Sequence, residues 1–324
     1  MTVLSLILAP VAHKLSLLDK PTERKNHQNV TPLVGGICIF LACGLTLFVF
    51  DDMPGQLLRP VVVAAALFLF LGVLDDQFDF KASVKLLAQV TISFVFISST
   101  GLQITDLGSP FGLAHSFELG ALSVPFTVIA IVGLVNAFNM IDGCDGLAAG
   151  LAALALLAIL YFGSTHLEFF TENFLLILVV SLTTFLFFNF VNNPRLKIFL
   201  GDGGSLFLGF TISVCLVDFA EGNEQHSPST VLWFVAVPIY DFVAVVARRL
   251  LLKRNIMAAD RSHLHHYLLS FGLSHFQTTM TILFAAISLL CLGVFLEADF
   301  PSLSLVAFIG LFTVYLLLRL LDHR

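Results

Sequence analysis

The sequence predicts an all-α fold, a polytopic membrane-embedded helical bundle of about 10–11 transmembrane helices that forms a single domain over residues 1–324. Of the residues, 58% are hydrophobic and only 12% are charged, whereas about one quarter of an average soluble domain is charged. Apolar runs long enough to cross a bilayer recur along the whole chain, with mostly short polar connections between them. A chain this apolar needs the bilayer as its solvent.

Eleven apolar runs are the expected helices. The first is short for a span of about 20 residues and carries Pro10 and Lys14, so we expect either a partial helix or a chain start farther upstream. It has neither a basic leading segment nor a small-residue cleavage site, which argues against a signal peptide. The runs cover residues 1–18, 33–50, 57–74, 84–104, 122–139, 147–163, 173–191, 204–220, 230–252, 277–297 and 302–320.

The Lys and Arg residues orient the bundle. Fifteen of the 16 lie in alternate connections or at the helix ends beside them, and the opposite connections hold only Arg59. The positive-inside rule makes the basic side cytoplasmic. We therefore expect a periplasmic N-terminus and a cytoplasmic C-terminus.

Other classes of site find no support in the sequence. The five cysteines lie mostly in apolar runs and form no C-x-x-C pair, so we interpret them as free thiols, without a disulfide framework or a zinc site. The net charge is −6, and no basic tail or aromatic-basic patch indicates a nucleic-acid partner.

Four polar clusters all fall on the basic side. In the first, Asp75 and Asp76 follow an apolar run, and Lys85 at the start of the next run is placed to pair with them or to bind a phosphate. Carboxylates at a membrane boundary are unfavourable unless they are solvated, paired or metal-bound. For an isolated aspartate pair, an ordinary interfacial turn is the more frequent explanation.

The second cluster runs from Asn136 to Asp145. Asn136 and Asn139 are three residues apart and share a helix face, and Asp142 and Asp145 each follow within six residues and precede a glycine. A helix N-cap explains one aspartate, but it does not explain two asparagines and two aspartates in ten residues. A functional site is favoured here.

The third cluster is the glycine-rich stretch 201–205, expected to be a flexible turn before a helix. Backbone N–H groups at a helix start attract phosphate, and Asp202 suits a hard cation such as Mg²⁺. A plain helix-start turn is an equal alternative. The stretch is not a Walker A loop, because no Gly-Lys-Ser/Thr follows.

The fourth cluster is a cationic loop that holds Arg261, His263, His265 and His266. Arg and His supply fixed donors to phosphate, and the nearby acids together with the missing cysteines favour an anion site over zinc. Asp241 approaches the same face, either to orient a cation of this loop or to pack helices.

These clusters place carboxylates, amides, a glycine turn and an Arg/His loop on one face. The set suits Mg²⁺-assisted phosphoryl transfer, in which catalysis is mainly positioning and charge neutralisation. Its location at the membrane boundary implies one lipid substrate and one cytosolic substrate.

In this order, the motifs resemble those of the polyprenyl-phosphate N-acetylhexosamine-1-phosphate transferase family, of the glycosyltransferase 4 type. The likeness covers nearly the whole chain, and several separate motifs in one order make it specific. It rests on Asp19-Lys-Pro21, Arg24-Lys25-x-His27, Pro32-Leu-Val-Gly-Gly36, Asp75-Asp76, Asn136 to Leu147, Phe199 to Ser205 and Asp260-Arg-Ser-His-Leu-His-His266.

The resemblance implies an enzyme of the bacterial inner membrane that transfers GlcNAc-1-phosphate from UDP-GlcNAc to undecaprenyl phosphate. The products are undecaprenyl-diphospho-GlcNAc and UMP, in the first membrane step of O-antigen or enterobacterial common antigen synthesis. Mg²⁺ is the implied cofactor, with Mn²⁺ as a substitute, and a homodimer is compatible with the family. Another UDP-N-acetylhexosamine is the alternative donor.

The resemblance also assigns roles to residues. Those roles are catalysis for Asp75, Asp76 and His265; metal binding for Asp202 and Asn139; phosphate or sugar binding for Lys85, Arg261, His263 and His266; nucleoside binding for Asp142, Asp145 and Phe199; and a contribution from Lys25 and His27.

Two other protein classes are alternatives. An ion-coupled transporter also carries membrane acids and histidines, but its ionisable residues should lie near mid-span within an inverted repeat, and neither feature is visible. A membrane metalloprotease would need H-E-x-x-H, which is absent.

Overall fold

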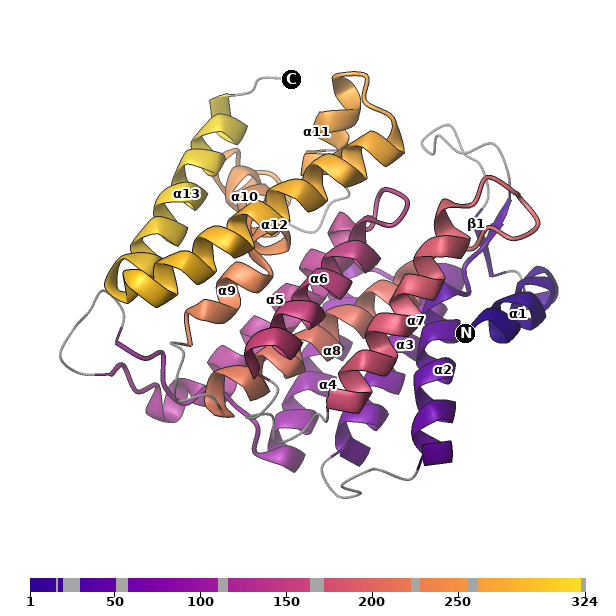
Figure 1. The fold of residues 1–324 in the computed structure, drawn as a ribbon, viewed down its shortest axis with the longest axis horizontal. Helices are drawn as coiled ribbons and strands as arrows, with labels where there is room; N and C mark the ends of the chain where they lie inside the picture. Colours follow the sequence, from indigo (N-terminus) through magenta and orange to yellow (C-terminus); the bar gives the residue numbers. More distant parts are fainter. Residues whose placement is uncertain are drawn as a thin grey trace.

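The computed structural model describes residues 1–15, 17–19, 30–50, 58–109, 116–163, 172–222, 228–255 and 262–321. These residues form a bundle of α-helices with one two-stranded sheet (Figure 1). In chain order the helices are α1 (Thr2–Leu15), α2 (Gly35–Phe50), α3 (Leu58–Phe78), α4 (Ala82–Thr100), η2 (Gly120–Leu122), α5 (Ser123–Ile141), α6 (Leu147–Gly163), α7 (Glu172–Phe190), α8 (Gly201–Gly222), α9 (Thr230–Phe234), α10 (Ala236–Leu251), α11 (Leu264–Ser270), α12 (His275–Asp299) and α13 (Pro301–Leu321).

The prediction of a polytopic membrane bundle is confirmed. Each predicted apolar run contains a helix, with ends that differ by at most four residues. Within the described residues, seven helices are long and apolar enough to cross a membrane, and three apolar helices are shorter. The short ones include α1, as its length in the sequence suggests.

The run 230–252 is two helices instead of one. Val235 leaves helical geometry, with φ −127° and ψ 28°, and separates α9 from α10. Pro238 lies in the first turn of α10, where the missing N–H of proline has no intrahelical partner to lose. A proline in the middle of one long helix would have removed such a bond, so the break precedes it.

Two polar clusters lie inside helices, where the sequence predicts connections. α3 continues to Phe78, which puts Asp75 and Asp76 in its last turn. α8 begins at Gly201, so the glycine-rich stretch is its first turn. The Asp76 carboxylate accepts the N–H groups of Asp202 and Gly203. N–H groups in the first turn of a helix have no hydrogen-bond acceptor within that helix. Asp76 of α3 supplies acceptors for two of them, which stabilises the start of α8 at this position.

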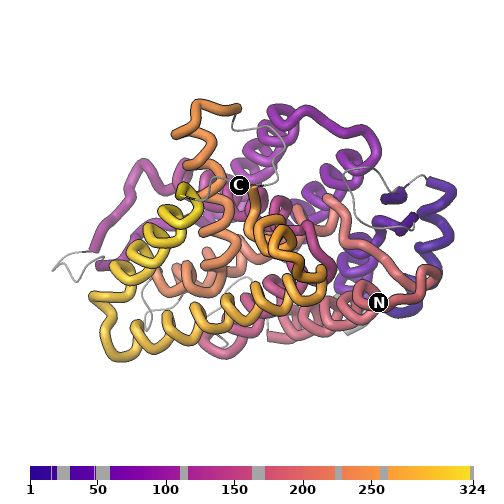
Figure 2. Tube along the Cα trace, turned by 90° about the horizontal axis from the view of Figure 1, so that it is seen from above, coloured from indigo at the N-terminus to yellow at the C-terminus, as the bar shows by residue number. Residues whose placement is uncertain are grey.

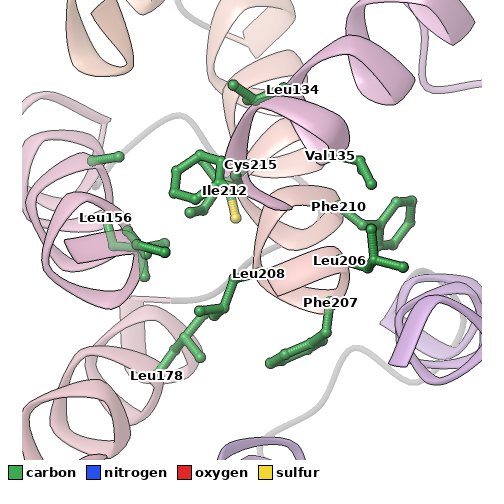
Figure 3. Packing of buried hydrophobic residues seen from close by; sticks show 14 of the residues in the cluster. Leu134, Val135, Leu156, Leu178, Leu206, Phe207, Leu208, Phe210, Ile212 and Cys215 are labelled. Atoms are coloured by element: carbon green, nitrogen blue, oxygen red, sulfur yellow. The ribbon is translucent and has the colours of Figure 1, made fainter. Parts of the chain in front are cut away.

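α8 is the central helix of the bundle. In its membrane-length window 94% of the residues are buried, and α3 and α5 make its most extensive contacts. Figure 3 shows its side chains enclosed by Leu134 and Val135 of α5, Leu156 of α6 and Leu178 of α7. The first turn of α8 is therefore carried by the best-packed element of the fold.

Glycines let the neighbouring backbones approach α8 closely. A Cβ on Gly36 of α2 would lie 2.2 Å from the Gly204 Cα, and one on Gly72 of α3 would lie 2.4 Å from the backbone of Asp202. Small residues at such crossings allow the close van der Waals packing on which helix association in membranes depends. Two helices thus fix the start of α8 from two sides.

α12 and α13 form the outer, lipid-facing side of the bundle. Only 22% and 17% of their membrane-length windows are buried, and both run along the periphery in Figure 2. Phe284 and Leu318 are among their exposed apolar side chains. These two helices therefore present most of their surface to the bilayer.

The small sheet and its neighbouring bonds connect the segment after α1, the start of α2 and the residues before α8. β1 (Leu18–Asp19) pairs antiparallel with β2 (Thr31–Pro32), and Leu33 forms a parallel bridge with Phe199. The backbone N–H groups of Gly35 and Gly36 donate to the carbonyls of Phe199 and Leu200, at 2.9 and 3.1 Å. These bonds fix the backbone of Phe199 directly before α8.

Candidate active site

A cavity of about 1610 Å³ lies at the end of the bundle that carries β1 and α11 (Figure 1). It collects the predicted site residues from all four polar clusters. Asp75 is not on its wall but is joined to it by Lys85. Arg261, Lys25 and His27 lie outside the described residues. The predicted residues on the wall are Asp76, Lys85, Asn139, Asp142, Asp145, Phe199, Asp202, His263, His265 and His266.

Asp75 is a buried carboxylate held by two donors. Its Oδ2 lies 2.6 Å from Lys85 Nζ, and its Oδ1 accepts the backbone N–H of Phe80 at 2.9 Å. It also lies within hydrogen-bonding reach of the Asp202 carboxyl. Of the two roles that the sequence left open for Lys85, pairing with the acids is the one observed.

Asp76 joins α3 to α8. Its two oxygens accept the N–H groups of Asp202 and Gly203 at 3.2 and 3.4 Å. A Cβ at position 201 would lie 2.8 Å from Asp76 Oδ2, and Gly201 has φ +74°, so both the space and the backbone favour glycine there. Asp76 thereby sets the position of the Asp202 backbone, while its catalytic role stays a prediction.

Asn139 holds the Asp202 side chain. Its Nδ2 donates to Asp202 Oδ1 at 3.1 Å and to Ser205 Oγ at 2.9 Å. Asn136 shares its helix face but turns to α4, where its Nδ2 donates to Gln89 Oε1 at 2.6 Å. Both asparagines line the cavity, so the predicted shared face is present with two different partner helices.

The donor set fits Mg²⁺. Asp75, Asp76 and Asp202 bring three carboxylates together beside one lysine, an excess of negative charge that a cation would relieve. Mg²⁺ prefers oxygen ligands and is usually held by one or two carboxylates plus substrate phosphates. Within the described residues no three acidic, His or Cys side chains are grouped closely enough to hold a metal ion by themselves, so magnesium binding stays a prediction.

A second part of the cavity joins Asp145, Lys197 and Phe199. Asp145 Oδ2 lies 2.6 Å from Lys197 Nζ, and that ammonium lies 5.5 Å from the centre of the Phe199 ring. Burial, with Asp76 and Asp145 nearby, raises the pKa of Asp142 to about 8. Charged, aromatic and protonatable groups here suit a polar, planar ligand.

The histidine loop contacts α10 on the side away from the cavity. His263 Nδ1 lies 2.8 Å from Asp241 Oδ2, so Asp241 contacts this loop directly. His265 is only 2% exposed, and its Nδ1 has no hydrogen-bond partner. Burial, assisted by His266 and His263, lowers the pKa of His265 to about 3. The sequence predicts a cationic loop, but His265 is neutral near pH 7.

Several polar residues on the cavity wall were not predicted as site residues, among them Asp79, Lys197 and Arg249. Asp79 follows Asp76 by three residues and lies directly after the end of α3, which the predicted run ending at residue 74 did not reach. Arg249 and Lys197 entered only the count of basic residues. Asn189 and Asn192 were the two candidates for a nucleotide-contacting asparagine, and the sequence did not decide between them. Asn189 is buried, its Nδ2 donates to the Ile198 carbonyl, and its Oδ1 has no partner.

The cavity also has an apolar arm. It continues from the polar residues along α5, between α4 and α10, toward the middle of these helices. Val90 and Ile129 on this arm are 38% and 71% exposed. The wall of the arm includes Leu86, Val90, Val128, Ile129, Val132, Phe242 and Val246.

Comparison with known proteins identifies the family. Residues 58–220, from α3 to α8, match the family model described as Glycosyl transferase family 4. The chain belongs to this family. It is 34% identical over 281 residues to the probable undecaprenyl-phosphate N-acetylglucosaminyl 1-phosphate transferase of Bacillus subtilis (strain 168), covering 86% of this chain and 77% of that protein.

Two enterobacterial relatives carry a similar name, undecaprenyl-phosphate alpha-N-acetylglucosaminyl 1-phosphate transferase. The Salmonella typhi protein is 33% identical over 304 residues, which is 91% of this chain and 81% of that protein. The Escherichia coli (strain K12) protein is 34% identical over 296 residues, with 89% and 78% covered. The family membership predicted from the motifs is confirmed, and with it the assignment of this chain to a family of transferases.

Proposed function

We propose that this glycosyl transferase family 4 protein transfers GlcNAc-1-phosphate from UDP-GlcNAc to undecaprenyl phosphate, giving undecaprenyl-diphospho-GlcNAc and UMP. One observation carries the proposal: a single cavity joins a carboxylate cluster to an apolar arm along the membrane-length helices α4 and α5. The names of the relatives give the sugar and the lipid.

The apolar arm suits the lipid acceptor. A polyprenyl chain is a long hydrocarbon, and the wall formed by α4, α5 and α10 is apolar along its length. Lys85 stands where the arm meets the polar cluster, because it precedes Leu86 and Val90 on the same helix. The acceptor phosphate would lie beside Lys85 and Asp75 while its chain follows α5.

The polar end suits the nucleotide sugar. Asp202, Asp76 and Asn139 would hold Mg²⁺, which supplies charge neutralisation on the diphosphate. Lys197 and Phe199 are placed to contact the nucleoside, with Asp145 holding the lysine. His265, being neutral and buried, is suited to a hydrogen bond with a sugar hydroxyl or a phosphate oxygen.

The reaction follows from this placement. An oxygen of the acceptor phosphate attacks the β-phosphorus of UDP-GlcNAc, the phosphorus that carries GlcNAc. The bond from that phosphorus to the bridging oxygen breaks, and UMP leaves with the bonding electron pair. Asp75, fixed by Lys85 and Phe80, orients the attacking phosphate or takes its proton. Positioning and charge neutralisation supply most of the rate in phosphoryl transfer.

We also propose that the cavity faces the cytoplasm of a bacterial cell, in the inner membrane, at the first membrane step of a surface glycan. Lys81, Arg249, Lys253 and Arg319 all lie at the cavity end of their helices, and Arg59 lies at the opposite end of α3. This distribution supports the orientation and a cytoplasmic C-terminus. The periplasmic N-terminus and the homodimer stay predictions.

The test is a reconstituted assay with purified protein, undecaprenyl phosphate, Mg²⁺ and radiolabelled UDP-GlcNAc. We expect label in the extracted lipid and an equal amount of UMP. Asp202→Ala should abolish both, whereas Glu172→Ala, which removes an exposed acid at the other end of the bundle, should not. Unlabelled UDP-GalNAc as a competitor tests the choice of donor. Intact UDP-GlcNAc would contradict the proposal, and release of UDP would indicate ordinary glycosyl transfer.

A further inference from the structure

The histidine loop is attached to two helices that are distant from it in sequence. Asp241 of α10 is 2% exposed. Its Oδ2 contacts His263 Nδ1 at 2.8 Å, and its Oδ1 accepts the Leu264 N–H at 2.7 Å and the Tyr315 hydroxyl at 3.3 Å. A buried carboxylate requires such donors. The same carboxylate therefore holds a histidine of the cavity and the first turn of α11.

α13 contributes a second attachment. The Arg319 guanidinium donates to the Ser262 carbonyl and lies 4.8 Å from the centre of the Tyr267 ring. Ser262 and Tyr267 flank the three histidines on either side. Arg319 itself is 7% exposed. We call Asp241, Tyr315 and Arg319 the α10–α13 clamp.

The clamp lies outside the cavity. None of its three residues is on the cavity wall, and no described residue of α13 is either. α13 is otherwise the most lipid-exposed of the long helices, with 17% of its window buried. Near its cavity end, however, two polar side chains turn inward and reach the histidine loop. Packing alone does not require polar groups at these positions.

The bond to Asp241 fixes the chemistry of the His263 ring. A carboxylate accepts only from a protonated nitrogen, so Nδ1 carries a hydrogen in this arrangement. Nε2 is then the ring atom left for a ligand, and His263 is on the cavity wall. The partner that a histidine has at one nitrogen sets the orientation and the tautomer of the other.

We propose that Asp241 is a positioning residue of the transfer reaction, supported by Tyr315 and Arg319, and that it directs Nε2 of His263 at the bound substrates. This inference rests on the proposed function. Asp241 acts through His263 and touches no substrate itself. α13 thus belongs to the catalytic apparatus although none of its described residues borders the cavity.

A mutant cycle with His263 separates positioning from packing. Asp241→Asn keeps the shape but offers an N–H or a weaker acceptor to Nδ1, and we expect kcat to fall roughly tenfold or more. In a His263→Ala background the same change should lower kcat by less than about twofold, because the two residues act as a unit. A packing role predicts equal losses in both backgrounds.

Tyr315→Phe is the milder variant for the case in which Asp241→Asn does not fold. It removes one hydrogen bond to Asp241, and we expect kcat to fall roughly 2–10-fold, again only when His263 is present. Tyr240→Phe is the matched control. Tyr240 lies beside Tyr315, with ring centres 6.2 Å apart, but its hydroxyl donates to the Phe308 carbonyl and does not reach the loop. We expect its kcat to stay at the wild-type value.

Hydrogen–deuterium exchange gives a readout that needs no turnover. We expect peptides from residues 262–270 to exchange faster in Asp241→Asn and Tyr315→Phe than in the wild type, and to be unchanged in Tyr240→Phe. Unchanged exchange in Tyr315→Phe, or equal kcat losses with and without His263, would overturn the proposal. A wild-type protein that forms no lipid product would contradict the proposed function, while the exchange result would still decide whether the clamp holds the loop.

Discussion

Gly143→Ala tests whether the position of His265 controls turnover. Gly143 lies in the loop between α5 and α6, and a Cβ there would lie 2.1 Å from His265 Nε2, 2.6 Å from Cε1 and 2.7 Å from Cδ2. Ordinary contact begins at 3.4 Å, so the closest approach is short by 3.4 − 2.1 = 1.3 Å. His265 is 2% exposed and lies on the cavity wall. Either the ring or the loop must move by about that distance.

The expected effect follows from the size of this displacement. A misplacement of about 1 Å in a catalytic arrangement can lower the rate about 100-fold, which corresponds to about 2.7 kcal/mol of activation free energy. Forcing an extra methyl into a packed site also lowers the free energy of unfolding by about 1–3 kcal/mol. We therefore expect a folded, less stable protein with a kcat 10–100-fold below that of the wild type.

The assay is steady-state UMP release with both substrates saturating, together with a thermal melt in detergent. Gly44→Ala is the control, because a Cβ on this glycine of α2 meets no atom within 4 Å. The double variant Gly143→Ala/His265→Ala should be no slower than His265→Ala alone. A Gly143→Ala protein that keeps more than half of the wild-type kcat would refute the reasoning, and so would a double variant with a further large loss.

Three other predictions concern the same end of the bundle. Lys85→Met leaves the buried Asp75 carboxylate without its cation, so the free energy of unfolding should fall by about 3 kcal/mol, which a melt measures. The transfer assay should show that lipid product is also lost. Lowering the pH from 7 to 5 should lower the melting temperature of the wild type relative to that of His265→Asn, because unfolded His265 takes up a proton near its ordinary pKa of 6.5 while the folded residue, with a pKa of about 3, does not. The comparison cancels the opposite contribution of Asp142, whose raised pKa favours the folded state at lower pH in both proteins. Gly72→Ala places a Cβ 2.4 Å from the Asp202 backbone, so a melt should show a loss of about 1–3 kcal/mol that Gly310→Ala, with open space around it, does not show.

Much of the fold was predictable because lipid imposes a simple constraint. A backbone in hydrocarbon must satisfy its hydrogen bonds internally, so each long apolar run becomes a helix. The break at Val235 was less visible, because the run stays apolar through residues 230–252 and only Pro238 marks it. The predicted end of α3 and the predicted start of α8 were wrong by three or four residues, because Asp75, Asp76 and Asp202 are polar but helical. The hydrogen bonds from the start of α8 to Asp76 make these polar residues compatible with the helices.

The site was predictable where its residues are clustered in sequence. Asp142 and Asp145, like His263 and His265, can be recognised because several polar residues occur close together in the sequence. Lys197 does not, because its partner Asp145 is 52 residues away and only the fold brings the two together. The clamp on the histidine loop was hidden for the same reason. Asp241 was noticed as a lone acid in an apolar run, but Tyr315 is 74 residues farther along the chain.

The exposure of α13 links the histidine loop to the thickness of the bilayer. A lipid-exposed helix responds to hydrophobic mismatch by tilting, and a tilt of α13 would displace Arg319 and Tyr315 near its cavity end. α8 is shielded by its neighbours, so the Asp202 carboxylate keeps its place under the same stress. Bilayers with shorter or longer acyl chains should therefore change the turnover of this protein more than they change the metal binding proposed for Asp202.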